Sequence, residues 1–96
     1  MAKLEDHCAA SLKEFGQPFT EVHQWLDEFA GTPRYGMRHW RVRHHEAGIR
    51  EVARLFGKEA GAVARRHIIT DLKEEGWKED DLFPRDEAHY ISLGLF

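Results

Sequence analysis

The chain has little of what holds small secreted proteins together. Cys8 is the one cysteine among 96 residues, which excludes an internal disulfide and a multi-cysteine zinc site. No run approaches the roughly 18 consecutive apolar residues of a membrane span. The acidic segment at residues 1–6 is not typical of a secretory signal. We therefore expect a cytoplasmic protein that makes no membrane contact.

Strand patterns are also lacking, and helical periodicity takes their place. Apolar residues recur at spacings of three and four, as in amphipathic helices. Helices are predicted over about residues 3–15, 18–30, 37–56 and 58–75, with a short last helix after Pro84 or Asp86. The hydrophobic fraction of 42% suits one modest core. The predicted fold is all-α, a compact bundle of four main helices plus a short C-terminal helix in one domain, 1–96.

Excess charge of either sign is small overall but unevenly distributed. The formal net charge is −3, yet residues 34–54 carry six arginines against two glutamates, between acidic segments. Overall acidity argues against general nucleic-acid binding. The basic block suits either an anionic small molecule or an acidic protein surface, or it is a solvated helix face.

Histidine, by contrast, is abundant, with seven in the chain. His23 and His45 fall on the apolar stripes of the second and third predicted helices. His67 and Asp71 lie four residues apart on the fourth, and a carboxylate on an apolar face needs a partner. Imidazole and carboxylate are ordinary ligands of zinc, iron, manganese and nickel. These four residues are the predicted metal ligands.

Other polar residues lie near the same faces. His7 and His39 are at the margins of their stripes, and His44 lies about 100° from His45; all three are further possible ligands. Arg38 and Arg41 occupy the polar end of the third helix, where they predict an anion-binding site. A bound metal that activates water, with these arginines neutralising phosphate charge, would give a phosphoester hydrolase.

Other interpretations remain open. A histidine on an apolar stripe is often a hydrogen-bonded core residue, and the same groups without metal would make a non-enzymatic binder of a nucleotide or phosphate. A third interpretation is a partner-binding module that uses an exposed face of Trp40, Arg43, Arg50 and Arg54.

One metal-dependent class is excluded. The sequence His45-Glu46-Ala47-Gly48-Ile49 lacks the second histidine of an H-E-x-x-H protease motif.

The order of these motifs resembles a family of small bacterial and phage proteins of unassigned function. The resemblance covers nearly the whole chain and implies that the histidine and aspartate positions belong to a family pattern. It also implies a phage or prophage origin, in which binding to a host protein is a natural role. Its most specific elements are R-H-H-x-x-G-I at 43–49, F-G at 56–57 and H-x-x-x-D-L at 67–72.

Overall fold

The computed structural model describes residues 3–28 and 40–95. Within these residues there are six helices and no strand, which confirms the all-α prediction. Four of the helices are seven residues or longer. The helices are α1 (Leu4–Phe15), α2 (Thr20–Leu26), α3 (Trp40–Arg43), α4 (Glu46–Phe56), α5 (Lys58–Glu74) and α6 (Glu87–Ser92).

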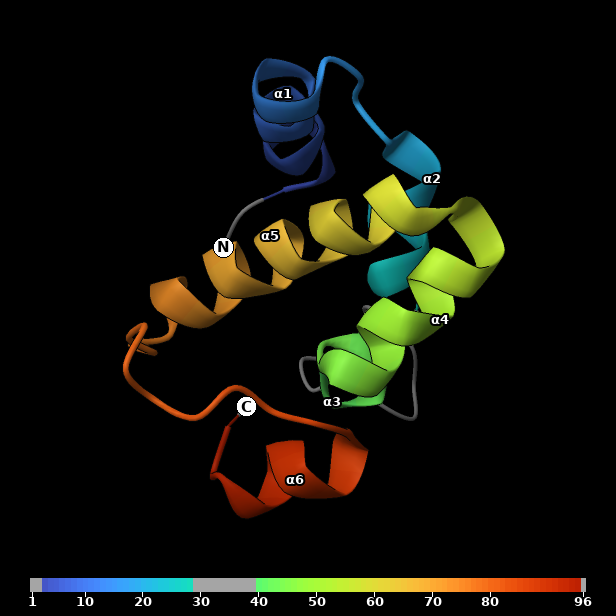
Figure 1. Cartoon of the computed structure of the whole chain (residues 1–96). Coiled ribbons are helices and arrows are strands. Elements are labelled where there is room, and N and C mark those ends of the chain that lie inside the picture. Colours follow the sequence, from blue (N-terminus) through green and yellow to red (C-terminus); the bar gives the residue numbers. More distant parts are fainter. Residues whose placement is uncertain (1–2, 29–39, 96) are drawn as a thin grey trace.

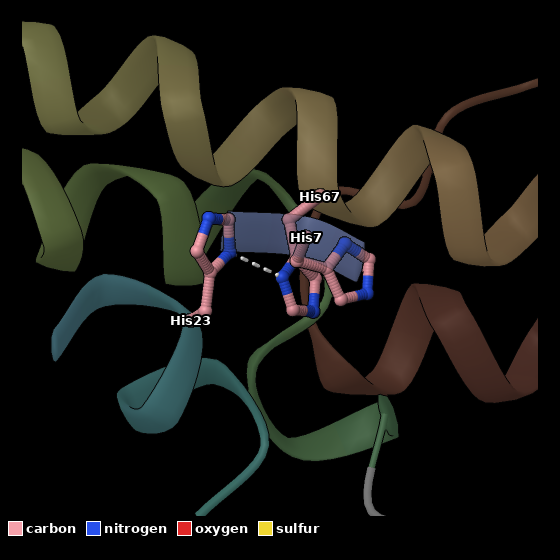
Figure 2. Close-up of side chains that lie close together, drawn as sticks. All are labelled: His7, His23 and His67. Atoms are coloured by element: carbon pink, nitrogen blue, oxygen red, sulfur yellow. Dashed lines mark hydrogen bonds between the residues drawn. The ribbon is translucent and has the colours of Figure 1, made fainter. Parts of the chain in front are cut away.

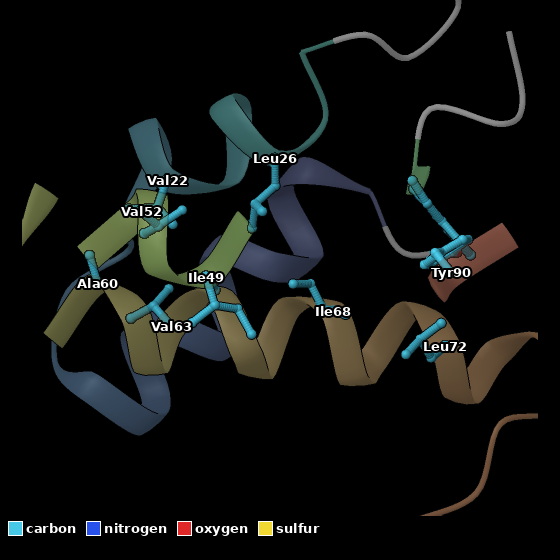
Figure 3. Packing of buried hydrophobic residues seen from close by; sticks show 11 residues of the cluster. Val22, Leu26, Ile49, Val52, Ala60, Val63, Ile68, Leu72 and Tyr90 are labelled. Atoms are coloured by element: carbon cyan, nitrogen blue, oxygen red, sulfur yellow. The ribbon is translucent and has the colours of Figure 1, made fainter. Parts of the chain in front are cut away.

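The longest helix, α5, runs across the molecule and has neighbours along its length (Figure 1). Helices α1, α2 and α4 pack against it, while α3 packs against α4 and α6. Val63, Ala64 and Ile68 of α5 are completely buried, and apolar side chains from α2 and α4 cover them (Figure 3). The core is therefore arranged around one face of α5, the same face that carries His67 and Asp71.

The predicted helix boundaries are largely confirmed where the structure describes them. Helix α1 ends at Gly16, whose φ of 83° lies in the left-handed region that favours glycine. Helix α6 begins after Asp86, whose Oδ1 accepts a hydrogen bond from His89 N at 2.8 Å. The predicted second helix, 18–30, is too long at both ends, because α2 begins at Thr20 and ends at Leu26, with residues 27–28 in a turn; residues 29–30 lie outside the described part.

The third predicted helix, 37–56, is wrong as a single element. The chain leaves the helical path after α3, and α4 begins only at Glu46. Between them His45 is extended, with φ of −160° and ψ of 176°, and its Nδ1 accepts a hydrogen bond from Gly48 N at 3.1 Å. His45 is thus the N-cap of α4 rather than an interior helical residue.

Two further contacts stabilise this break. The N–H groups of Glu46 and Ala47 donate to the carbonyls of Pro84 and Arg85, at 3.0 and 2.9 Å. These are first-turn donors that have no partner within their own helix. A Cβ placed on Gly48 would lie 1.9 Å from the carbonyl oxygen of Arg43. Only glycine therefore allows the chain to fold back so closely.

No helix in the described part of the chain is both long enough and apolar enough to cross a membrane.

Candidate metal centre

Four polar side chains meet beside α5 although they come from three parts of the chain. His67 and Asp71 project from α5, His44 lies at the break between α3 and α4, and Asp27 follows the last residue of α2. One nitrogen or oxygen atom from each lies within 4.8 Å of the others. The histidines and Asp71 are buried, whereas the side chain of Asp27 is 28% exposed. We call these four residues the central tetrad.

The four nitrogen–oxygen separations within the tetrad fall in a narrow range. Oδ2 of Asp71 lies 3.1 Å from His44 Nε2 and 3.2 Å from His67 Nε2. Oδ1 of Asp27 lies 3.5 Å from His44 Nε2 and 3.4 Å from His67 Nε2. Each imidazole nitrogen therefore faces one oxygen from each carboxylate.

The other ring nitrogen of His67 faces away from the tetrad. His67 Nδ1 lies 2.8 Å from His23 Nδ1 (Figure 2). On the other side of the His23 ring, Nε2 lies 2.7 Å from Ser11 Oγ. All three residues are buried. A continuous path of short hydrogen bonds thus leads from the tetrad through α2 to α1.

His7 makes a second type of contact with the tetrad. Its ring stacks on that of His67, with centroids 3.6 Å apart and planes inclined by 15°. Its Nε2 lies 3.1 Å from Asp71 Oδ1, the carboxylate oxygen that does not face His44. Although nitrogens of His7, His23 and His67 are also close together, lone pairs lie in the ring planes, and stacked rings do not direct them at one point. These three histidines therefore support the tetrad better than they form a ligand set of their own.

Burial keeps two of the histidines neutral. Loss of hydration lowers the pKa of His23 to about 4, helped by the neighbouring His67 and His7. Burial likewise lowers the pKa of His44 to about 4, although its bond to Asp71 opposes the change. Neutral imidazole is the form that binds a metal ion.

The pKa values of His67 and Asp71 move in the opposite sense to what burial alone would give. Burial would lower the pKa of His67, but the carboxylates of Asp27 and Asp71 outweigh it and raise the pKa. Burial would raise the pKa of Asp71, but its close contacts with the imidazoles of His44, His67 and His7 hold it far below its usual range. Asp71 is therefore an anion throughout the physiological range, and the tetrad attracts positive charge.

The structure brings together most of the residues predicted from sequence. His67 and Asp71 are in the tetrad, His23 contacts it through His67, and His7 and His44 contact Asp71 directly. His45 does not join them, because Nδ1 caps Gly48 and Nε2 lies 3.0 Å from the carbonyl of Val42. The structure therefore gives His44 the place that the unbroken helix assigned to His45.

Two predicted site residues, Arg38 and His39, lie outside the described residues. Arg41 is half-buried, and within the described part of the chain its Nε has no hydrogen-bond partner. Trp40, predicted to lie on an exposed face, is instead 2% exposed, and its ring stacks on His44 with centroids 5.5 Å apart. The expectation of an exposed Trp40 is wrong, because the turn of α3 directs this side chain inward.

Asp27 was missed by reasoning from sequence, although a signal exists. His23 and Asp27 repeat the four-residue spacing of His67 and Asp71, so the chain contains H-x-x-x-D twice. Asp27 is the residue after α2, where the periodicity of apolar residues no longer indicates direction.

Fold and site together define a class of small all-α protein with a buried cluster of histidine and aspartate ligands. The family model that matches residues 2–85 is described as a domain of unknown function, DUF6915, and the chain belongs to this family. No curated protein and no solved structure matches the chain.

Proposed function

We propose that the protein binds one divalent transition-metal ion, of the zinc class, at the central tetrad. The ligands are Asp27 Oδ1, His44 Nε2, His67 Nε2 and Asp71 Oδ2. His67 and Asp71 are two of the four ligands predicted from sequence. His44 was predicted as a further possible ligand, and Asp27 was not predicted. His23 and His45 are not ligands in this proposal.

The spacing of the four ligand atoms carries the proposal. Zinc bonds to imidazole and carboxylate of 2.0–2.2 Å place tetrahedral ligand atoms about 3.3–3.6 Å apart. The four nitrogen–oxygen separations of the tetrad are 3.1, 3.2, 3.4 and 3.5 Å. These four separations therefore differ by only a few tenths of an ångström from those around a zinc ion, and the nitrogen–nitrogen and oxygen–oxygen pairs lie within 4.8 Å.

A metal-free hydrogen-bond network is the main alternative, and it accounts for fewer of these distances. N–H···O bonds cluster near 2.9–3.0 Å, so the separations of 3.4 and 3.5 Å at Asp27 are long. His67 Nε2 is buried with two carboxylate oxygens near it, yet it makes no well-directed hydrogen bond within the described part of the chain. A nitrogen aimed between two oxygens suits a shared cation better than either single bond.

Charge supports the same conclusion. Two carboxylates of the tetrad carry a formal charge of −2, which one divalent cation cancels. Both imidazoles and Asp71 are almost completely shielded from water, where uncompensated charge is costly. Four protein ligands in a buried place are typical of structural metal sites, whereas catalytic sites keep an open position. We therefore propose a role in metal-dependent folding or metal holding ahead of phosphoester hydrolysis.

Metal content and affinity test the proposal. Untagged protein, stripped with chelator and then titrated calorimetrically with zinc, is expected to bind one equivalent. Asp71→Asn keeps the shape of the side chain but removes its charge and is expected to lose this binding. His89→Gln is the matched control, because the His89 ring on α6 accepts hydrogen bonds from N and Nε of Arg85 and is not part of the tetrad.

The outcomes are distinct. Stoichiometric zinc binding that survives in His89→Gln and disappears in Asp71→Asn supports the tetrad. Failure of wild-type protein to bind zinc, cobalt, nickel, manganese or iron(II) contradicts the proposal. Phosphatase activity against a simple aryl phosphate, lost together with the metal, would restore the hydrolase interpretation.

A specific observation supports a second candidate, a small anion-binding site. The hydroxyl of Tyr90 is buried without a hydrogen-bond partner in the described residues, as is Nε of Arg41. Both groups are donors, and the positive charge of Arg41 acts on Tyr90, whose pKa burial raises. Phosphate or sulfate would satisfy such donors. Chelator-insensitive phosphate binding that Arg41→Gln removes would support this function, and unchanged binding in that variant would contradict it.

A further inference from the structure

The hydrogen bonds on the side of His67 away from the tetrad indicate how its ring is held. His67 presents Nε2 to the tetrad and Nδ1 to His23, so one ring joins the candidate centre to α2. At the far end, His23 Nε2 meets the hydroxyl of Ser11 in α1 at 2.7 Å. We call His67, His23 and Ser11 the relay.

Metal binding leaves only one arrangement of hydrogens along the relay. If Nε2 of neutral His67 holds the metal through its lone pair, Nδ1 must carry the ring hydrogen. A hydrogen bond of 2.8 Å to His23 Nδ1 then requires a lone pair on that nitrogen. The hydrogen of neutral His23 consequently resides on Nε2 and is donated to Ser11 Oγ. Each member thus has one donor facing one acceptor.

Ser11 suits the end of such a relay because its hydroxyl can accept one hydrogen bond while donating another. A serine within a helix commonly donates to the carbonyl four residues earlier, which leaves its lone pairs free for His23. An alanine at this position would leave His23 Nε2–H buried without an acceptor, at a cost.

We propose that His23 and Ser11 are positioning residues that select the metal-binding tautomer of His67. This inference rests on the proposed metal site and extends it outward, as hydrogen bonds behind histidine ligands do in other metal proteins. His23, which the sequence indicated as a ligand, thereby acts one step behind the ligand. The inference also accounts for the burial of Ser11, a polar residue, on α1.

The tautomers can be measured directly in wild-type protein. Nitrogen-15 NMR of the histidine rings, recorded with and without one equivalent of zinc, assigns the hydrogen on each ring nitrogen. In the zinc-loaded protein, His67 is expected to carry hydrogen on Nδ1, and His23 on Nε2 alone. Hydrogen on His23 Nδ1 in the loaded protein would overturn the proposal without any variant having to fold.

Variants provide the second measurement. Ser11→Ala is expected to weaken zinc binding roughly 10-fold to 100-fold, the usual effect of losing an outer hydrogen-bond partner. Ser11→Thr retains a hydroxyl and is expected to restore most of the affinity. Ser92→Ala, which removes an exposed hydroxyl on α6, is the control and should bind like wild type.

The results separate the two proposals. If wild-type protein binds no transition metal, the metal site itself fails. If wild type binds zinc and Ser11→Ala binds it equally well, the tetrad survives and the positioning role is refuted. A loss in Ser11→Ala that Ser11→Thr does not repair also refutes it, because the hydroxyl would then not be the active feature.

Discussion

Asp71 and Asp27 contribute to the tetrad in different ways. Asp71 is buried, and its two oxygens face three histidine nitrogens at 3.1–3.2 Å. Asp27 is partly exposed, and its Oδ1 faces two histidine nitrogens at 3.4 and 3.5 Å. Asp71 is therefore integral to the core with or without metal, whereas Asp27 lies at the partly exposed edge of the tetrad and faces the same imidazole nitrogens at longer range.

Substitution of each aspartate by asparagine should separate these roles. Asp71→Asn is expected to destabilise even the metal-free protein by about 1–3 kcal/mol, because buried histidine donors lose their charged acceptor. Asp27→Asn is expected to cost less metal-free stability than Asp71→Asn, because the Asp27 side chain is 28% exposed and lies farther from the histidine nitrogens. It should still lower zinc affinity by more than roughly 100-fold, beyond the usual loss for an outer-shell partner. Urea unfolding in chelator and zinc titration measure the two effects, and equal destabilisation by both variants would contradict the distinction.

The sequence predicted a contact between two site residues where both lie on the same helix. His67 and Asp71 are four apart on an uninterrupted helix, so their contact follows from helical geometry. Asp71 was expected to need a partner, and His67 Nε2 lies 3.2 Å away. The contacts of Asp71 with His7 and His44 span 64 and 27 residues, and no local periodicity contains that information.

At the scale of elements, the break between α3 and α4 decides which histidine enters the tetrad. The prediction placed His44 and His45 on one continuous helix, where their directions differ by about 100°. Extended backbone at His45 changes these directions and turns His44 inward. Its causes are tertiary, since the first N–H groups of α4 bond to residues 84 and 85. Within the segment itself, Gly48 is the residue that indicates the break.

Gly48→Ala tests the break. The added methyl group would meet the backbone oxygen of Arg43, which cannot move as a flexible side chain could. A loss of about 2 kcal/mol or more in unfolding free energy is expected, together with weaker zinc binding as His44 shifts. Gly61→Ala is the control, because its methyl group would lie 3.4 Å from Ala53 Cβ and alanine favours a helix interior. Similar stability of the two variants would disprove the close approach.

His45→Ala tests the reassignment of that residue from ligand to helix cap. Loss of a side-chain cap costs about 0.5–2 kcal/mol, and a loss in this range is expected in chemical denaturation. Zinc affinity and stoichiometry should stay near the wild-type values, since both ring nitrogens of His45 face backbone groups away from the tetrad. Loss of one metal equivalent in this variant would return His45 to the ligand set.

At the scale of the molecule, the histidine cluster replaces part of an apolar core. Five histidines are buried, His7, His23, His44, His45 and His67, and all of them except His45 belong to the cluster. The all-α class and the approximate order of the helices follow from the periodicity of apolar residues, which identifies the apolar face of each helix. The convergence of α1, α2 and the α3–α4 break on α5 depends on long-range contacts and could not be read from those faces.

This polar core predicts how stability depends on pH in chelator. The pKa values of His23 and His44 are about 4 in the folded protein against about 6.5 when unfolded. Between these values the unfolded chain binds more protons, so stability is complete above pH 6.5 and falls towards pH 4. The raised pKa of His67 acts in the other direction, with stability present below pH 6.5 and lost as pH rises through its folded value. Maximum stability is therefore expected near pH 6.5.

The fall in stability on the acid side of this maximum gives the sharper measurement. Two protons taken up on unfolding correspond to a slope of about 3 kcal/mol per pH unit where both histidines contribute fully, and a total loss of several kcal/mol by pH 4. Asp71 adds a further loss only at lower pH, because its folded pKa is depressed. His23→Asn removes one titrating group and should reduce the slope by about half. Urea midpoints measured every half pH unit between 4 and 8 would establish this, and a flat profile from pH 7 to 5 would show that buried neutral histidines do not control the fold.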